Sequence, residues 1–196
     1  MAIFNIASSL ALEKNLEDKI SWCKRHLKKV SKGSSRYVFF VDDATVLKIA
    51  YSEAGIEQNN VEFNDALIGQ LGAKSYAKDD GYVWITQEYA EPVDEETFER
   101  LSGKPFQFMH DFVYGVRRTY VLGTELPHDF KELLVTGNTI FKEVYEYLLR
   151  AKIDACVDYG KMTSWGKRKT SDGDKLIIVD YGVNDEVYRK YYKIKK

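Results

Sequence analysis

The chain has 196 residues, enough for one domain or two small lobes, and 44% hydrophobic with 14% aromatic residues can supply a buried core. Its 29 basic and 30 acidic residues give a formal charge of -1, which provides no overall field for attracting nucleic acid or an anionic membrane. No apolar run reaches the roughly 18 residues of a membrane helix, and the start of the chain lacks a basic targeting region. Cys23 and Cys156 are too few for a disulfide framework or a four-ligand metal site. We therefore expect a cytoplasmic protein that recognises its partners locally and binds neither nucleic acid nor membrane.

The first third of the chain predicts a helix, a hairpin and a second helix. Apolar residues three and four apart over 13–30 indicate an amphipathic helix. Residues 36–51 hold two β-rich runs separated by Asp42 and Asp43, which favour a tight connection. A helix follows over 55–70, with glycines near its end.

The middle of the chain predicts a boundary between two lobes. Residues 81–93 read as a buried strand that leaves through a polar connector containing Pro92. Residues 94–101 have the acidic first turn that the helix dipole favours. We therefore expect an N-lobe over 1–91 and a second lobe over 92–196.

The second lobe is expected to be mainly helical and to end in a hairpin. Helical pieces are predicted near 106–118 and 129–134. Residues 139–157 give the strongest helical periodicity of the chain. Residues 167–182 predict a hairpin with an Asp-Gly turn, whose second strand delivers Asp180.

Lys48 is the first candidate functional residue. In the strand VLKIA the period of two places Val46, Lys48 and Ala50 on one face. A cation on a small apolar surface suits a ligand that has a flat apolar part and an anionic part. The alternative is a solvated strand lysine.

Two further features lie near Lys48 in the sequence. The turn of Gly33, Ser34 and Ser35 offers backbone N–H groups and hydroxyls that could surround an anionic group. Glu62 lies within the following helix and could hold the Lys48 ammonium in place, with Glu57 as its competitor.

Two aspartates are candidates in the second half. Asp180 ends an apolar strand and is followed by Tyr-Gly, which places a carboxylate at the mouth of a buried strand. Carboxylates in such positions commonly hold Mg²⁺, which prefers oxygen ligands. Asp158 follows the long helix and could accept a proton from a hydroxyl. The sequence leaves open whether Asp158 or Asp154 has that position.

Taken in order, these elements resemble the protein-kinase fold. The resemblance rests on seven features in sequence order: the glycine turn at Gly33, Val38 five residues later, Lys48 in its strand, Glu62 in the next helix, the connector TQEYA, a long helix, and a terminal DYG. The segment GIEQNNVEFN, and the pair WG followed by IIVDYG, look particularly like the compact kinase-like proteins of bacteriophages. The likeness covers residues 30–96 and 139–183. It implies an α+β, two-lobed protein-kinase-like fold, with a small antiparallel-sheet N-lobe and a truncated, mainly helical C-lobe.

The resemblance also implies a nucleotide site in a cleft with Lys48 and Asp180 on opposite walls. Lys48 would bind the α and β phosphates of ATP, and Glu62 would be its partner. The remaining residues that the resemblance assigns to the nucleotide are the turn at Gly33, Ser34 and Ser35, the adenine roof of Val38 and Val46, the gatekeeper Gln87, and the backbone of Glu88 and Ala90 at the adenine edge.

For the reaction itself, the resemblance implies that Asp180 would hold Mg²⁺ and that Asp158 would be the catalytic base. The chain departs from the family at several points. It has one glycine in the turn, Cys156-Val157 where a His-Arg pair is usual, and Ser164 where a metal-binding Asn is expected, so that Ser164 would be the second metal ligand. Only 14 residues follow Gly182, which leaves no room for an activation segment or for the helices that bind peptide substrates.

The expected function is therefore binding of ATP with Mg²⁺, with transfer of the γ-phosphate to a protein hydroxyl. One alternative is a catalytically impaired pseudokinase that binds or inhibits a host protein. Another is a small-molecule phosphotransferase, which also needs no activation segment. A nucleotide is the expected ligand in each case, with a protein partner or substrate in the first two.

Overall fold

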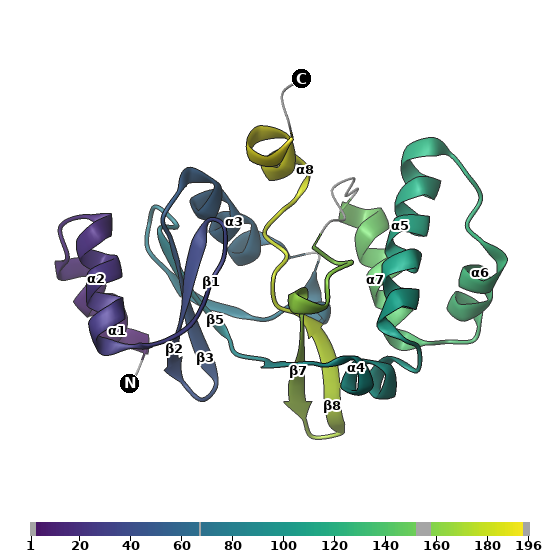
Figure 1. The fold of residues 1–196 in the computed structure, drawn as a ribbon, viewed down its shortest axis with the longest axis horizontal. Coiled ribbons are helices and arrows are strands. Elements are labelled where there is room, and N and C mark those ends of the chain that lie inside the picture. The colour runs from purple at the N-terminus through teal and green to yellow at the C-terminus, as the bar shows by residue number, and fades with distance from the viewer. Residues whose placement is uncertain (1–2, 67, 152–157, 194–196) are drawn as a thin grey trace. The chain divides into compact units, whose positions relative to one another are not determined.

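The structure is a computed structural model that describes residues 3–66, 68–151 and 158–193 (Figure 1). Asp154, Cys156 and Val157, which the sequence singled out, lie outside the described residues. The chain divides into two compact units. Unit 1 comprises Met1–Asn64 and Ala73–Tyr89, and unit 2 comprises Asp65–Gly72 and Ala90–Lys196. The segment Asp65–Gly72, which the sequence assigned to the N-lobe, therefore packs with the second part of the chain.

Unit 1 is an antiparallel sheet with three helices. Its elements in chain order are α1 (Ile3–Leu12), α2 (Leu16–His26), β1 (Lys28–Lys32), β2 (Arg36–Asp42), β3 (Thr45–Ala50), α3 (Glu53–Asn64), β4 (Ser75–Lys78) and β5 (Trp84–Glu88). The five strands are ordered β1-β2-β3-β5-β4, so β3 lies at the centre of the sheet. The predicted hairpin over 36–51 is present as β2 and β3.

The helix predicted over 13–30 is shorter in the structure. Asn15 caps α2 by accepting a hydrogen bond from the backbone N–H of Asp18. The helix ends at His26 because Leu27 takes an extended conformation, with φ -120° and ψ 146°. The chain from Lys28 onward then pairs with β2, so the last residues of the predicted helix form a strand. The helix α1 and the strand β4 were not predicted.

The two faces of the unit 1 sheet have different roles. One face is apolar and packs against α1 and α2, in a core that contains Leu10, Cys23, Phe39, Leu47 and Ile49. The opposite face carries every second residue of the same strands. Val38 pairs with Lys48, Lys48 pairs with Ile85, and Val46 pairs with Gln87. The apolar core thus fixes the register, and the register sets Lys48 and Gln87 on the same face.

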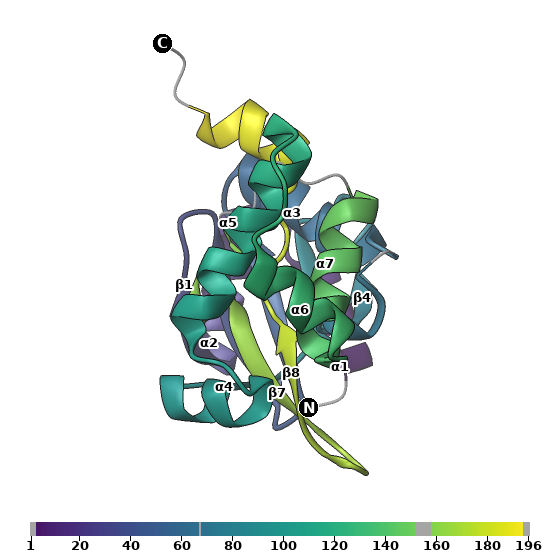
Figure 2. The same cartoon turned by 90° about the vertical axis from the view of Figure 1, so that its right-hand side faces the viewer.

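Unit 2 is mainly helical (Figure 2). It also includes a three-stranded antiparallel sheet. Its elements are η1 (Gly69–Leu71), β6 (Glu91–Pro92), α4 (Glu95–Ser102), α5 (Phe106–Leu122), α6 (His128–Val135), α7 (Thr139–Ala151), η2 (Met162–Ser164), β7 (Trp165–Thr170), β8 (Gly173–Ile178), α8 (Asp185–Val187) and the π-helical turn η3 (Tyr188–Tyr192). The helices predicted near 106–118, 129–134 and 139–157 correspond to α5, α6 and α7, although α7 is described only to Ala151.

Aromatic side chains dominate the core of unit 2. Phe112 packs edge-on against Phe130 and Phe141, with ring centroids 5.3 and 5.1 Å apart. The helices α5 and α6 approach closely because residue 115 is glycine: a Cβ atom there would lie 2.7 Å from Phe130. Buried Tyr147 donates a hydrogen bond to Asp65, which ties the segment Asp65–Gly72 to α7.

The structure confirms the α+β class, with a small antiparallel-sheet unit and a mainly helical unit. Among the described residues, no helix combines the length and the apolar character that crossing a bilayer requires.

Candidate functional site

Lys48 lies at the centre of the unit 1 sheet, on β3 between β2 and β5. Its side chain is only 7% exposed, and its Nζ atom donates a hydrogen bond to Oε2 of Glu62 over 2.6 Å. Glu62 projects from α3, and its side chain is fully buried. The contact that the sequence suggested between Lys48 and Glu62 is thus present.

Arg36 is a second cation on the same carboxylate, and it was not predicted from the sequence. Its Nη2 atom donates to Oε1 of Glu62 over 2.8 Å, and its Nη1 atom donates to Asn59 over 3.2 Å. Each oxygen of Glu62 therefore accepts a hydrogen bond from a different cation. We call Arg36, Lys48 and Glu62 the ion cluster; it contains two positive charges and one negative charge.

The ion cluster keeps Glu62 ionised. Burial by itself would raise the pKa of the Glu62 carboxyl, but the charges and hydrogen bonds of Arg36 and Lys48 lower it to about 2. At neutral pH the carboxylate is consequently a pure hydrogen-bond acceptor.

Neighbouring polar groups hold this arrangement in place. Asn59 donates to the backbone oxygen of Tyr82 over 2.9 Å, which joins α3 to the chain just before β5. Ser75 donates to the backbone oxygen of Glu62. Gln87 is completely buried and donates from Nε2 to Oε2 of Glu62 over 3.4 Å. Because the Glu62 carboxylate can only accept hydrogen bonds, the Gln87 amide must present its NH₂ group to it. Within the described ranges, Oε1 of Gln87 then has no hydrogen-bond donor.

Apolar residues surround the ion cluster on its face of the sheet. Val46 is buried, whereas Val38 and Phe40 are half-buried. The ring of Phe40 packs against Tyr89, with centroids 4.8 Å apart. The face therefore combines a fixed cation with partly exposed apolar side chains, as expected for a ligand that is flat at one end and anionic at the other.

The predicted phosphate turn uses much of its hydrogen-bonding capacity internally. The hydroxyl of Ser35 is buried and donates to Gln58 over 3.1 Å. The backbone N–H of Gly33 donates to the oxygen of Arg36, and the oxygen of Gly33 accepts from the Tyr51 hydroxyl. Ser34 is exposed. The turn is therefore well anchored, but Ser35 is turned inward rather than toward a ligand.

The predicted adenine-edge residues fall at the end of unit 1 and the start of unit 2. The backbone N–H of Glu88 already donates to the oxygen of Lys74 over 2.7 Å. Ala90 is the first residue of its segment in unit 2. It lies so close to Gly166 that a Cβ atom at position 166 would be 2.7 Å from the Cβ atom of Ala90.

In unit 2, the negative charges of Asp158 and Asp180 both stabilise the ammonium of Lys161. The Lys161 ammonium donates to Oδ1 of Asp158 over 2.8 Å, and Asp158 is buried. Partial burial by itself would lower the pKa of Lys161, but the hydrogen bond and charge of Asp158 and the charge of Asp180 together raise it. Asp180 follows β8 and is half-buried. Unit 2 thus brings both predicted aspartates into one electrostatic cluster, together with a lysine that was not predicted.

The donors for a metal ion are limited. Within the described residues, no group of three or more His, Cys, Asp or Glu side chains could hold a metal ion. Ser164, the other predicted metal ligand, is 2% exposed, so an ion could reach its hydroxyl only after rearrangement. Asp180 remains a suitable ligand, since Mg²⁺ in nucleotide sites is commonly held by one or two carboxylates together with phosphate oxygens.

Two polar residues of these clusters, Arg36 and Lys161, were not predicted from the sequence. Arg36 lies 26 positions before Glu62. An arginine directly before the apolar run of β2 was the available signal, since such a residue is rarely buried without a charged partner. For Lys161, the available signal was its spacing of three residues after Asp158.

No protein-family model matches the chain, and a search of the curated proteins found no match either. A search of the solved structures found an aminoglycoside phosphotransferase in its ADP-bound crystal structure. The two sequences are 13% identical, the alignment covers 83% of this chain and 69% of that chain, and the TM-score is 0.34. Values this low support no conclusion about fold or function.

Proposed function

We propose that the chain binds ATP, with Lys48 as the ligand of its phosphates. The observation that carries the proposal is the buried ion cluster, in which Glu62 holds the Lys48 ammonium at a fixed place on a central strand. A second cation, Arg36, remains on Glu62 if Lys48 turns to a phosphate. Lys48 can therefore exchange its partner without leaving a buried carboxylate uncompensated.

A contribution to the stability of the fold does not by itself explain why the ion cluster is buried. Buried ion pairs pay a desolvation penalty, and well-packed apolar residues often replace them at no loss of stability. A preorganised cation beside partly exposed apolar residues is, in contrast, a common arrangement in ligand sites. Val38, Val46 and Phe40 would contact the base, and Gln87 would lie beside it.

Asp180 is the proposed ligand of Mg²⁺, together with oxygens of the bound phosphates. The metal ion, when bound, would neutralise the charge of the phosphates. Ser164 is not included because its hydroxyl is buried.

For phosphoryl transfer, Asp158 is the proposed base that accepts the proton of an attacking hydroxyl, and the hydroxyl of a protein is the proposed acceptor. One observation favours a second candidate, a nucleotide-binding module without transfer activity. Lys161 already donates to Oδ1 of Asp158 over 2.8 Å, so this carboxylate oxygen is occupied and would have to exchange the ammonium before it could accept a proton.

Equilibrium titration with ATP and Mg²⁺ tests the binding proposal, using isothermal calorimetry on the wild type and on Lys48→Met. This variant removes the charge and keeps the Arg36–Glu62 pair, so the fold should persist. We expect saturable binding by the wild type and at least tenfold weaker binding by the variant. Lys74→Met is the matched control, since Lys74 is an exposed lysine of the same unit. Equal affinity of all three proteins would refute the role of Lys48.

Transfer is tested separately, with γ-labelled ATP and a cell lysate. Label on a protein that requires Asp158 and disappears in Asp158→Asn supports phosphotransfer to protein. Binding of ATP without any label transfer supports the nucleotide-binding module. ADP release that depends on an added metabolite would instead identify a small-molecule phosphotransferase.

A further inference from the structure

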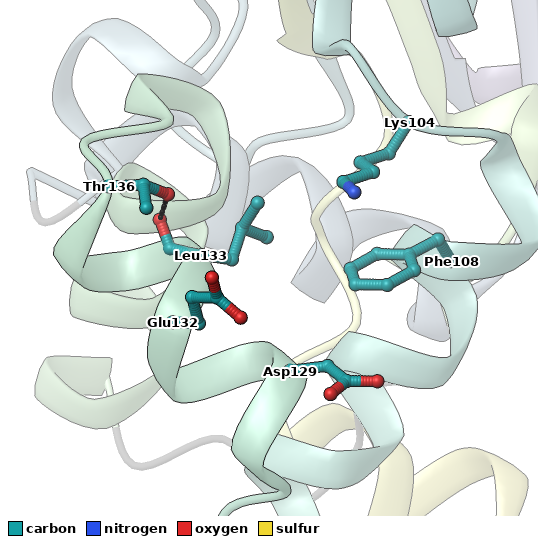
Figure 3. Close-up of a pocket in the computed structure, with 6 residues that line it drawn as sticks. All are labelled: Lys104, Phe108, Asp129, Glu132, Leu133 and Thr136. Atoms are coloured by element: carbon teal, nitrogen blue, oxygen red, sulfur yellow. Dashed lines mark hydrogen bonds between the residues drawn. The ribbon is translucent and has the colours of Figure 1, made fainter.

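A separate pocket lies within unit 2, between the start of α5 and one side of α6 (Figure 3). Its volume is about 280 Å³. Its lining consists of Lys104 and Phe108 from the α5 side, of Asp129, Glu132 and Leu133 from α6, and of Thr136, which caps the C-terminus of α6. The residues of α6 recur three and four positions apart, so one face of this helix lines the pocket.

The apolar part of the pocket is rigid. Phe108 packs edge-on against Phe130 and Phe141, with centroids 5.2 and 5.6 Å away, which fixes its ring. Leu133 is buried beside it. The pocket therefore has a preformed apolar wall rather than one that a ligand must organise.

The pocket also carries opposite charges that are not paired with each other. The Lys104 ammonium lies over the ring of Phe108, 5.2 Å from its centroid. Figure 3 shows the ammonium of Lys104 and the carboxylate of Glu132 both directed into the space between the two helices. Within the part of the chain that the structure describes, neither group forms an ion pair. Asp129 adds a second carboxylate at the same rim.

We propose that this pocket binds a small zwitterion, namely a free α-amino acid with an apolar side chain of about the size of leucine. The ligand carboxylate would meet Lys104, its ammonium would meet Glu132 with support from Asp129, and its side chain would contact Phe108 and Leu133. Lys104 precedes α5 whereas Glu132 lies on α6, so the two charges come from different elements, and one ligand that carries both charges satisfies both at once.

The size of the pocket fits this class of ligand. A volume of about 280 Å³ corresponds to roughly nine water molecules, at ~30 Å³ each. It lies just below the roughly 300 Å³ at which pockets for drug-sized molecules begin. A ligand of about ten non-hydrogen atoms with exposed charges is expected to bind with a dissociation constant on the order of 1 mM.

Nuclear magnetic resonance titration of the full chain tests the proposal, with the backbone amide signals of Leu133 and Thr136 as reporters. The probes are leucine, leucine amide, which lacks the carboxylate, and N-acetyl-leucine, which lacks the ammonium. We expect saturable shifts with leucine and at least tenfold weaker binding of both analogues.

Three variants assign the charges. Lys104→Met should abolish the preference for leucine over leucine amide, and Glu132→Gln should abolish the preference for leucine over N-acetyl-leucine. Glu125→Gln is the matched control, because Glu125 pairs with Lys131 and does not line the pocket. No saturable shift at 50-fold the expected dissociation constant, equal binding of all three probes, or the same loss in Glu125→Gln would each overturn the proposal.

Discussion

Replacement of Glu62 by Gln is the change that tests the ion cluster most sharply. The substitution keeps the volume of the side chain and removes the charge between Arg36 and Lys48. In the folded protein the pKa of Glu62 is about 2, against 4.5 for the ordinary carboxyl. A difference of this size corresponds to about 3 kcal/mol of stability at pH 7, in the range of about 3–5 kcal/mol for breaking a buried ion pair.

The stabilisation that the Glu62 carboxylate provides should decrease as the pH falls. Because the folded-state pKa is lowered, the Glu62 carboxylate stabilises the fold fully above about pH 4.5, and this contribution is lost as pH falls toward 2. The difference in unfolding free energy between the wild type and Glu62→Gln should therefore fall from about 3 kcal/mol at pH 7 to roughly 1 kcal/mol at pH 3.

Urea unfolding followed by circular dichroism at both pH values measures this difference. Glu53→Gln is the control, because Glu53 is an exposed carboxylate on the same helix. A Glu62→Gln effect that is the same at pH 7 and pH 3, or no larger than that of Glu53→Gln, would refute the reasoning.

Further predictions concern backbone packing and the attachment of the segment Asp65–Gly72. Gly55→Ala should destabilise unit 1 by about 1–3 kcal/mol in thermal or urea unfolding, because the new Cβ atom would lie 2.4 Å from the backbone oxygen of Ser35. Gly33→Ala should change stability little, since its nearest neighbour would be 3.8 Å away; equal effects of the two changes would contradict this packing. Tyr147→Phe should cost about 1–2 kcal/mol, because it removes the hydrogen bond to Asp65 and leaves that carboxylate with one donor fewer. Hydrogen exchange should then quicken in residues 65–72, and unchanged exchange there would argue against Tyr147 as their anchor.

The elements that the sequence predicted well are those whose pattern is local. The strands around Lys48 alternate cleanly between an apolar face and a mixed face, and α7 repeats its apolar residues at helical spacing. Residues 28–30 continue the helical spacing of α2, yet they pair with β2, because a hydrogen-bonding partner distant in sequence decided their conformation.

The candidate site was predictable only in part for the same reason. Lys48 and Glu62 could be predicted because they lie on consecutive elements, a strand and the helix that follows it. The place of Arg36 on Glu62 depends on the register of β2 against β3, which composition and periodicity do not reveal. The inward turn of Ser35 likewise depends on Gln58, 23 residues away.

Chemical labelling with an acyl-phosphate derivative of ATP tests the central claim most directly, because this reagent acylates a lysine amine that lies next to the bound phosphates. Peptide mass spectrometry then identifies the modified lysine. Binding of ATP by the ion cluster predicts preferential acylation of Lys48, with protection by excess ATP and Mg²⁺. Acylation spread over exposed lysines such as Lys74, with no protection by ATP, would contradict the account.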